Sequence, residues 1–393
     1  MGEISNYGDS INVQVDRIKD NDWILELEDI EKDSANINQF LKKSERSISG
    51  VRHQFYTGEI LYSKLRTYLN KVLVAPKEGY CTTELMSFNT YGVMSNKFVC
   101  HVLRSPYFLD YTLRCGYGVK MPRLSTADAC KGMIPLPPLG EQQRIVAKIE
   151  RWFSLIEQIE QVKNDLQTAI KQAKSKILDL AIHGKLVPQN PNDEPVSKLL
   201  KRINPKAKIT SDNEHYENLP NGWCYASIKE VFKINPRNKA DDSSKAGFIS
   251  MTNISDGYFN TFRYETRQWY EVKTGFTHFA DGDIAVAKIS PCLENRKSII
   301  LKDLPNGIGA GTTELYIFRS QCIDAKYGLF FFKSDYFINQ CINSFNGVVG
   351  QQRVSKSIIE DIDIAIPPLE EQMRIANKVS LLFSTLDKIA EEL

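Results

Sequence analysis

Two closely similar stretches decide the fold: IPLPPLGEQQRI at residues 134–145 and IAIPPLEEQMRI at residues 364–375. They lie 230 positions apart, and each joins a double proline to a Glu-Gln pair and then to an Arg-Ile pair. Other short motifs recur in the same order, and self-similarity of this kind indicates an internal repeat. The sequence therefore predicts a tandem duplication in which each copy is a globular unit followed by a helix.

Shorter motifs extend the repeat upstream of the prolines, with an offset that drifts because the loops differ in length. The matching pairs are Thr83-Glu84 and Thr313-Glu314, Arg123-Leu124-Ser125 and Arg353-Val354-Ser355, Gly58-Glu59-Ile60 and Gly282-Asp283-Ile284. A weaker echo aligns Trp23, followed by Asp29-Ile30, with Trp223, followed by Glu230-Val231. We therefore expect the two tryptophans to occupy matching positions in the two copies.

A long helix is predicted after each double proline, because proline is tolerated at the start of a helix. From Leu139 to Ile182 the only breaker is Gly140 at the very start, and Gly184 is placed to end the helix. Apolar residues recur in steps of four and three, which is the heptad seam of a coiled coil. The seam residues are Ile145, Ile149, Trp152, Ile156, Ile159, Leu166, Ile170, Ile177 and Leu180 in the first helix and Ile375, Val379, Leu382, Leu386 and Ile389 in the second. We expect the matched heptads, Ile145 to Ile159 and Ile375 to Ile389, to pack antiparallel.

The fold class is predicted to be α+β: two α/β globular units separated by two long antiparallel coiled-coil helices, with pseudo-two-fold symmetry. Short β-rich runs indicate strands, and two longer runs indicate helices. The expected strands cover 60–62, 72–74, 284–287 and 315–318, and the expected short helices cover 104–113, 325–343 and a stretch near 195–203. The glycines of 307–311 precede a strand and are expected to form a turn. The predicted domains are 1–138, a central helix and linker at 139–216, 217–367, and a distal helix at 368–393.

The composition is that of a globular protein and excludes several classes. The 393 residues are 42% hydrophobic and carry a net charge of +2, and no apolar run approaches the ~18 residues of a membrane span. The N-terminus has neither the basic nor the apolar region of a signal peptide. Eight scattered cysteines without a CxxC, and only five histidines, argue against a zinc site or a disulfide scaffold. Free thiols in a reducing cytoplasm are therefore expected, without a metal site and without membrane attachment.

Motifs for catalysis are missing from the sequence. There is no GxxxxGK[ST] loop for ATP and no Asn/Asp-Pro-Pro-aromatic tetrapeptide of an adenine methyltransferase. Glu271-Val272-Lys273 matches half of a nuclease site, but no acidic partner accompanies it. We therefore predict a chain without a catalytic site or cofactor of its own.

A basic, glycine-rich loop precedes the double proline in each copy, at 116–125 and 347–355. Glycine lets backbone approach a ligand closely, while Lys and Arg reach phosphates or guanine and Gln reads adenine. Further basic and amide side chains follow the first strands of each copy. The predicted DNA-binding residues are Lys64, Arg66, Asn70, Lys71, Lys120 and Arg123 in the first copy and Lys288, Arg296, Lys297, Gln351, Gln352 and Arg353 in the second.

Nearly the whole sequence resembles the specificity subunit of a type I restriction–modification enzyme. The stretches that carry the resemblance are 134–150, 364–379, 177–203, LPNGW at 219–223, GEILYSKLRTYLNKV at 58–72 and GDIAVAKISPCLENR at 282–296. The resemblance implies that 1–138 and 217–367 are target-recognition domains, each reading one half of a split sequence in double-stranded DNA. It also implies that the helices space the two halves and dock two methyltransferase subunits. Restriction/translocase subunits would join the full complex, and S-adenosylmethionine and ATP would belong to partner subunits.

Two other readings stay open at the level of the sequence. The chain could be a coiled-coil scaffold whose globular units bind proteins rather than DNA, against which the basic glycine-rich loops argue. It could also be a fused enzyme in which one unit methylates or cuts DNA, against which the missing motifs argue.

Overall fold

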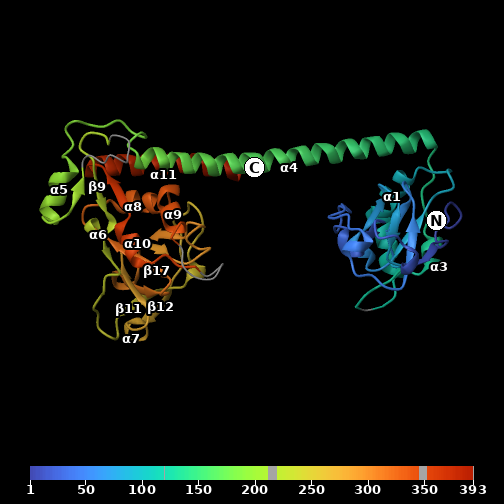
Figure 1. Cartoon of the computed structure of the whole chain (residues 1–393), viewed down its shortest axis with the longest axis horizontal. Coiled ribbons are helices and arrows are strands. Elements are labelled where there is room, and N and C mark those ends of the chain that lie inside the picture. Colours follow the sequence, from blue (N-terminus) through green and yellow to red (C-terminus); the bar gives the residue numbers. More distant parts are fainter. Residues whose placement is uncertain (119, 211–218, 345–351, 393) are drawn as a thin grey trace. The chain divides into compact units, whose positions relative to one another are not determined.

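The computed structural model describes residues 1–118, 120–210, 219–344 and 352–392 (Figure 1). The chain divides into two compact units, Met1–Glu160 and Gln161–Leu393. The eight cysteines are free. Among the described helices, none is long and apolar enough to cross a membrane.

In the described part of the first unit, strands form a four-stranded sheet of order β1-β3-β6-β2 and a three-stranded sheet of order β5-β4-β7. The strands are β1 (Ile11–Gln14), β2 (Ile24–Leu25), β3 (Val51–Phe55), β4 (Ile60–Ser63), β5 (Val72–Val74), β6 (Gly79–Cys81) and β7 (Leu85–Phe88). The helices are α1 (Asn96–Arg104), α2 (Pro106–Cys115), α3 (Thr126–Lys131) and α4 (Leu139–Ile182), of which α4 continues into the second unit. One core cluster joins β4, β5 and β7 to α1 and to the start of α4.

The described part of the second unit has sheets of order β12-β11-β16-β13, β10-β17-β14-β15 and β18-β9-β8. The strands are β8 (Ile209–Thr210), β9 (Cys224–Ser227), β10 (Lys233–Ile234), β11 (Lys245–Ile249), β12 (Glu265–Gln268), β13 (Thr277–Ala280), β14 (Ile284–Ala287), β15 (Ser298–Ile300), β16 (Ile308–Gly311), β17 (Leu315–Arg319) and β18 (Asp363–Ile366). The helices are α5 (Val196–Ile203), α6 (Ile228–Val231), α7 (Trp269–Val272), α8 (Ala325–Phe332), α9 (Asp335–Ile342), α10 (Lys356–Asp361) and α11 (Leu369–Glu391). The largest core cluster joins α8, α9 and the β14–β17 sheet to α11 and the end of α4.

The predicted repeat is confirmed by the sheets of the two units. The order β3-β6-β2 matches β13-β16-β11, with antiparallel pairing on one side of the central strand and parallel pairing on the other in both units. The order β5-β4-β7 likewise matches β15-β14-β17. The fold class is therefore α+β with an internal duplication, as predicted.

The expected equivalence of the two tryptophans is wrong. Trp23 directly precedes β2, whose counterpart is β11, whereas Trp223 precedes β9 in another sheet. Met1 instead matches Ile228 at the start of α6, because the Met1 amine donates to the Gly132 carbonyl at 2.5 Å as the Ile228 N–H donates to the Ile362 carbonyl at 2.9 Å. Tryptophan recurrence alone was too weak a signal to align two copies whose loops differ in length.

Most predicted elements are confirmed, with two corrections. The helix expected at 104–113 is α2, at Pro106–Cys115, and α1 before it was not expected. The helix expected at 325–343 is a pair, α8 and α9, interrupted at Lys333-Ser334. The Ser334 hydroxyl accepts a hydrogen bond from the Phe337 N–H and so starts a new helix. Of the glycines expected in a turn, Gly307 ends a 3-10 turn, whereas Gly309 and Gly311 lie in strand β16. A Cβ at Gly309 would lie 2.2 Å from the Phe279 ring, so glycine is needed there for close packing between strands.

The long helices are confirmed, and α4 has the predicted bounds, Leu139–Ile182. Within the second unit, α11 runs antiparallel to the end of α4. The Lys174 ammonium pairs with Asp387 near the end of α11, while Arg374 near its start pairs with Asp193, which follows α4. Lys174 is only 6% exposed and lies over the Phe383 ring at 5.3 Å, so a charged residue sits inside this contact.

The predicted pairing of the seam heptads is wrong. Ile170, Ile375 and Val379 are buried; Ile145, Ile149, Leu166, Ile177, Leu180, Leu382 and Leu386 are partly buried; Trp152, Ile156, Ile159 and Ile389 are exposed. The buried face of α11 belongs to the core of the second unit together with Leu178, Ala181 and Ile182 of α4. Thus α11 packs on the last turns of α4 rather than on Ile145 to Ile159, because the globular unit fixes where α11 begins.

A buried glutamine ties each long helix to its globular unit. The Gln142 carboxamide accepts a hydrogen bond from the Ser95 N–H at 2.8 Å and donates to the Pro137 carbonyl at 2.9 Å. The Gln372 carboxamide accepts from the Asp324 N–H at 2.7 Å and donates to the Pro367 carbonyl at 3.0 Å. Ser95 and Asp324 are the N-caps of α1 and α8, so the Glu-Gln motif docks one helix start on another.

Replacing Gln372 with alanine should lower the free energy of unfolding by about 1–3 kcal/mol, because buried backbone groups lose their partners. The neighbouring Met373 is 45% exposed, which makes Met373→Ala a matched control that should change stability little. Urea denaturation of both variants measures the difference. Equal midpoints for the two variants would show that Gln372 does not anchor the helix.

Candidate nucleic-acid interface

In the first unit the glycine-rich loop is tied to the strand β4 end by both backbone and side chains. The Leu124 N–H donates to the Lys64 carbonyl at 2.9 Å, and the Arg66 N–H donates to the Pro122 carbonyl at 2.7 Å. The Arg123 guanidinium donates two hydrogen bonds to the Glu84 carboxylate, one of 3.3 Å from Nε and one of 2.9 Å from Nη2. The loop residue Arg123 and Lys64 thus come together, as predicted.

The second unit repeats this arrangement. The Val354 N–H donates to the Lys288 carbonyl at 3.1 Å, and the Arg353 guanidinium bonds the Glu314 carboxylate at 2.9 Å from Nε and 3.0 Å from Nη2. These hydrogen bonds hold the pKa of Glu314 below its ordinary value. The Lys288 ammonium lies 5.2 Å from the centre of the Tyr316 ring. We call Lys64, Glu84 and Arg123, and their counterparts Lys288, Glu314 and Arg353, the two loop clamps.

Other predicted loop residues surround the clamps. Lys120 is exposed in the first loop. In the second, the Gln352 carbonyl accepts a hydrogen bond from the Ser290 N–H at 2.8 Å, whereas Gln351 lies outside the described residues. The two glutamates of the clamps were not among the predicted site residues. The signal that could have found them is the recurrence of Thr-Glu at the same offset as the arginines.

Asn70 and Arg296 occupy matching positions behind the loops and bind protein groups. Both have left-handed backbone, with φ of 53° and 57°. The Asn70 amide donates to the Arg104 carbonyl at 3.2 Å, and Arg296 Nε donates to the Lys333 carbonyl at 3.0 Å. Arg296 also pairs with Asp335 and is only 13% exposed. These contacts give both residues a structural role, and their predicted contact with DNA stays untested.

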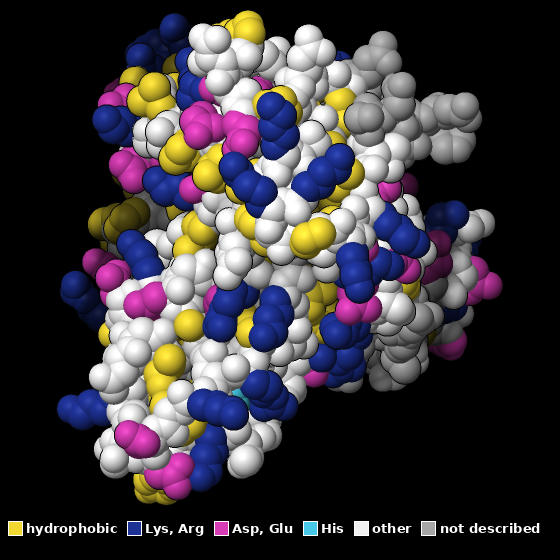
Figure 2. Space-filling view, turned by 90° about the vertical axis from the view of Figure 1, so that its left-hand side faces the viewer, with side chains coloured by type: hydrophobic (Ala, Val, Ile, Leu, Met, Phe, Trp, Pro, Cys, Tyr) yellow, Lys and Arg dark blue, Asp and Glu magenta, His cyan; other side chains and the backbone are white. Residues whose placement is uncertain are grey.

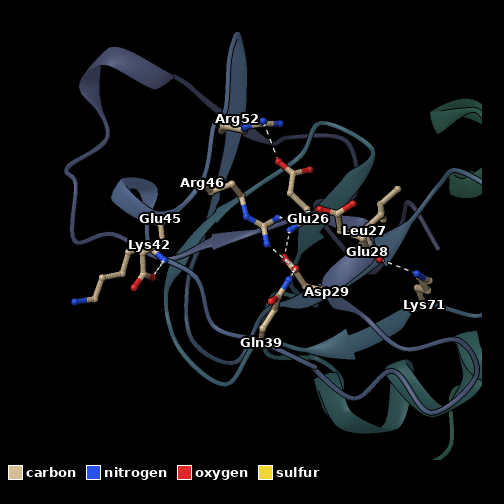
Figure 3. A network of polar contacts seen from close by, with 10 residues as sticks. All are labelled: Glu26, Leu27, Glu28, Asp29, Gln39, Lys42, Glu45, Arg46, Arg52 and Lys71. Carbon is tan, nitrogen blue, oxygen red and sulfur yellow. Dashed lines mark hydrogen bonds and ion pairs between the residues drawn. The ribbon is translucent and has the colours of Figure 1, made fainter. Parts of the chain in front are cut away.

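Lys71 and Lys297 also point toward protein groups. Figure 3 shows the Lys71 amine directed at the Leu27 carbonyl, at 2.6 Å, beside the buried Arg46–Asp29 pair. Lys297 donates to the Met251 carbonyl at 3.2 Å and is 15% exposed. The structure therefore brings Lys64, Arg66 and Arg123 together at the first loop and Lys288, Gln352 and Arg353 at the second. The side chains of Asn70, Lys71, Arg296 and Lys297 instead bind protein groups.

Lys333 is a buried amine that the sequence did not single out. It is fully buried, and its ammonium donates to the Gly257 carbonyl at 2.6 Å and to the Arg296 carbonyl at 2.9 Å. Burial, and then the nearby charge of Arg296, lower the pKa of Lys333 from 10.5 to about 7. Arg104 in the first unit bonds the Ser34 carbonyl at 2.9 Å in the same way. The two basic residues thus fasten a loop to the end of α1 or α8.

The pKa of Lys333 predicts a pH dependence of stability. Between about pH 7.5 and 9.5 the unfolded chain holds a proton on this amine that the folded chain has lost, so folding becomes more favourable as pH rises. The difference in unfolding free energy between the wild type and Lys333→Met should grow by about 1.4 kcal/mol per pH unit in this range. Lys326→Met, on the exposed side of the same helix, should give no such trend. Parallel curves for wild type and Lys333→Met would contradict the prediction.

Local positive charge is present although the net charge is small. Figure 2 shows the side of the molecule at the left of Figure 1, with many Lys and Arg side chains spread over it and Asp and Glu side chains between them. Within the described residues, no group of three His, Cys, Asp or Glu is placed to hold a metal ion. The paired clamps and the basic surface suit contact with a polyanion.

Comparison with known proteins first shows which class of protein this chain resembles. The family described as type I restriction modification DNA specificity domain matches residues 220–393. A solved structure is described as the basis of complex assembly and conformational transition of the type I R-M system. It matches 98% of this chain and 93% of its own chain, with a TM-score of 0.62 and 16% sequence identity. This match confirms the fold. Residues 220–393, which make up most of the second unit, are thus similar to this family of DNA specificity domains.

Two relatives from Escherichia coli then show how far the similarity extends along the chain. The specificity subunit of the type I restriction enzyme EcoAI is 39% identical over 279 residues, covering 65% of this chain and 47% of the relative. That of EcoEI is 40% identical over 242 residues, covering 57% of this chain and 41% of the relative. The predicted resemblance to the specificity subunits of type I restriction–modification systems is thus confirmed. The chain spans about half the length of the relatives it matches.

Proposed function

We propose that the chain is the DNA-reading subunit of a type I restriction–modification complex. Each globular unit would read one half of a bipartite target in double-stranded DNA, with residues 1–138 and 217–367 as the target-recognition domains. The observation that carries this proposal is the duplicated loop clamp, which presents a basic loop from the same place in both units. Two equal readers in one chain suit a target made of two blocks.

We further propose that catalysis resides in partner subunits. Two methyltransferase subunits would dock on the long helices, restriction/translocase subunits would complete the complex, and S-adenosylmethionine and ATP would bind to those partners. Exposed apolar side chains of α4, Trp152, Ile156 and Ile159, support a protein contact along this helix. The same observation favours the alternative of a scaffold that binds only proteins, which a DNA-binding measurement decides.

Binding of the full chain to random-sequence duplex should weaken steeply as salt rises, because each neutralised phosphate releases counterions. Lys120→Gln should reduce the slope of log affinity against log salt by about one if Lys120 contacts a phosphate. Lys378→Gln, on the exposed side of α11, is the matched control and should leave the slope unchanged. Binding that is absent or insensitive to salt would favour the scaffold.

We also propose that α4 sets the gap between the two recognised blocks. Residues 151–160 are exposed all along the helix and end where the two units divide, so added residues there would leave both cores intact. Seven residues inserted after Glu160 keep the heptad phase and add about 10 Å, or roughly three base pairs of DNA. Mapping methylated sites in cells with the partner subunits should show both blocks unchanged and a longer gap.

A four-residue insertion at the same point serves as the control, because it breaks the heptad phase. It should impair methylation rather than shift the gap. An active seven-residue variant with an unchanged gap would show that the helix is not the ruler.

A further inference from the structure

The Arg–Glu ion pairs of the two loop clamps lie at the protein surface, so burial does not explain why both units have them. Arg123 and Glu84 are 42% and 24% exposed, and Arg353 and Glu314 are 46% and 27% exposed. Ion pairs this exposed contribute little to stability, typically below about 1 kcal/mol. Yet the same two-hydrogen-bond geometry occurs in both units, in loops whose other residues differ.

A better-buried ion pair of the second unit provides the contrast. Asp283 is 1% exposed and takes two hydrogen bonds of 2.7 Å from Arg319. The strand register aligns these residues with Glu59 and Asn89 of the first unit, so this pair has no counterpart there. The half-exposed pair is the one that both copies have, which points to a role at the surface.

We propose that Glu84 and Glu314 are positioning residues for DNA recognition, an inference that rests on the proposed DNA-reading function. Each carboxylate takes two of the five N–H donors of its arginine and fixes the plane of the guanidinium. The glutamate itself is fixed, because its carbonyl accepts the Lys64 or Lys288 N–H at 3.0 Å. Strand, carboxylate and guanidinium therefore form one rigid chain of contacts.

The clamp has two consequences for binding. A guanidinium held in one plane can meet only one arrangement of acceptors, which favours a particular base edge over others. The carboxylate also offsets part of the positive charge, which lowers attraction to phosphates at any sequence. Glutamate in this position therefore lowers the affinity for DNA of any sequence and raises the selectivity for particular bases. Without it, the positive charge of the arginine would not be offset, and its attraction to phosphates would be stronger.

Glu314→Gln, which keeps the size of the side chain and removes its charge, tests the role. Full chain is mixed with a random-sequence duplex library, and the bound fraction is sequenced at several salt concentrations. We expect affinity for unselected duplex to rise and the salt slope to steepen by about one. Discrimination should fall about tenfold at positions of one block only. Glu84→Gln should relax the other block in the same way.

Two controls separate positioning from general effects. Glu194→Gln removes the partner of Arg202 of α5 in a more exposed pair, 42% and 63% exposed, and should change neither slope nor selectivity. In an Arg353→Ala background, Glu314→Gln should have no further effect, because the carboxylate acts through Arg353.

The outcomes are distinguishable. A wild type that shows no salt-dependent binding overturns the proposed function itself. A wild type that binds, with glutamine variants that keep its slope and selectivity, overturns the role of the glutamates alone. An effect of Glu314→Gln that persists without Arg353, or a loss of all binding together with a lower melting temperature, also overturns it, since either would show a purely structural pair.

Discussion

One buried carboxamide in each copy determines where the long helices begin, and the rest of the structure depends on it. Gln142 and Gln372 are 2% and 0% exposed, and each bonds a helix N-cap on one side and a proline carbonyl on the other. Each accepting carbonyl belongs to a proline that precedes a second proline, so its φ is fixed and its ψ is restricted to the extended region. The carboxamide, which both donates and accepts, is the side chain that can join these two groups. Glutamate could not donate, and leucine would leave both groups unpaired.

Because the start of each helix is fixed, the globular unit decides which helix face is buried. In the second unit, Phe383 of α11 packs against Tyr258 at 5.3 Å and Phe330 at 5.8 Å, and the last turns of α4 cover it. The repeat aligns Phe383 with Phe153 of α4. Phe153 is 48% exposed and lines an open groove of about 770 Å³ with Trp152 and Ile156. One seam in the sequence is thus a core in one unit and a surface in the other.

The sequence predicted the parts of the fold that depend on local pattern. The bounds of α4, the strands at 60–62 and 284–287 and the duplication all follow from periodicity, proline and glycine placement, and recurrence. The prediction from sequence failed where contacts between distant residues determine the structure. Heptad spacing says that Ile156 and Val379 suit a seam, but not that only Val379 meets a core. The glycines of β16 resemble a turn unless the Phe279 ring that needs the space is known.

In the candidate site, too, local sequence pattern predicted some features, and distant contacts determine the others. Arg123 and Arg353 lie on loops whose glycines and charges mark them, and the structure places both at equivalent surface positions. Arg296 and Lys71 have the same charges, but their ammonium or guanidinium groups are taken by carbonyls and carboxylates of the fold. A cation in a sequence is a candidate for phosphate contact only until its local partners are known. Hydrogen-bond acceptors decide whether a basic side chain lies at the surface or is bound within the fold. At the surface, Glu84 and Glu314 orient the two arginines, and a count of positive charges would not reveal them.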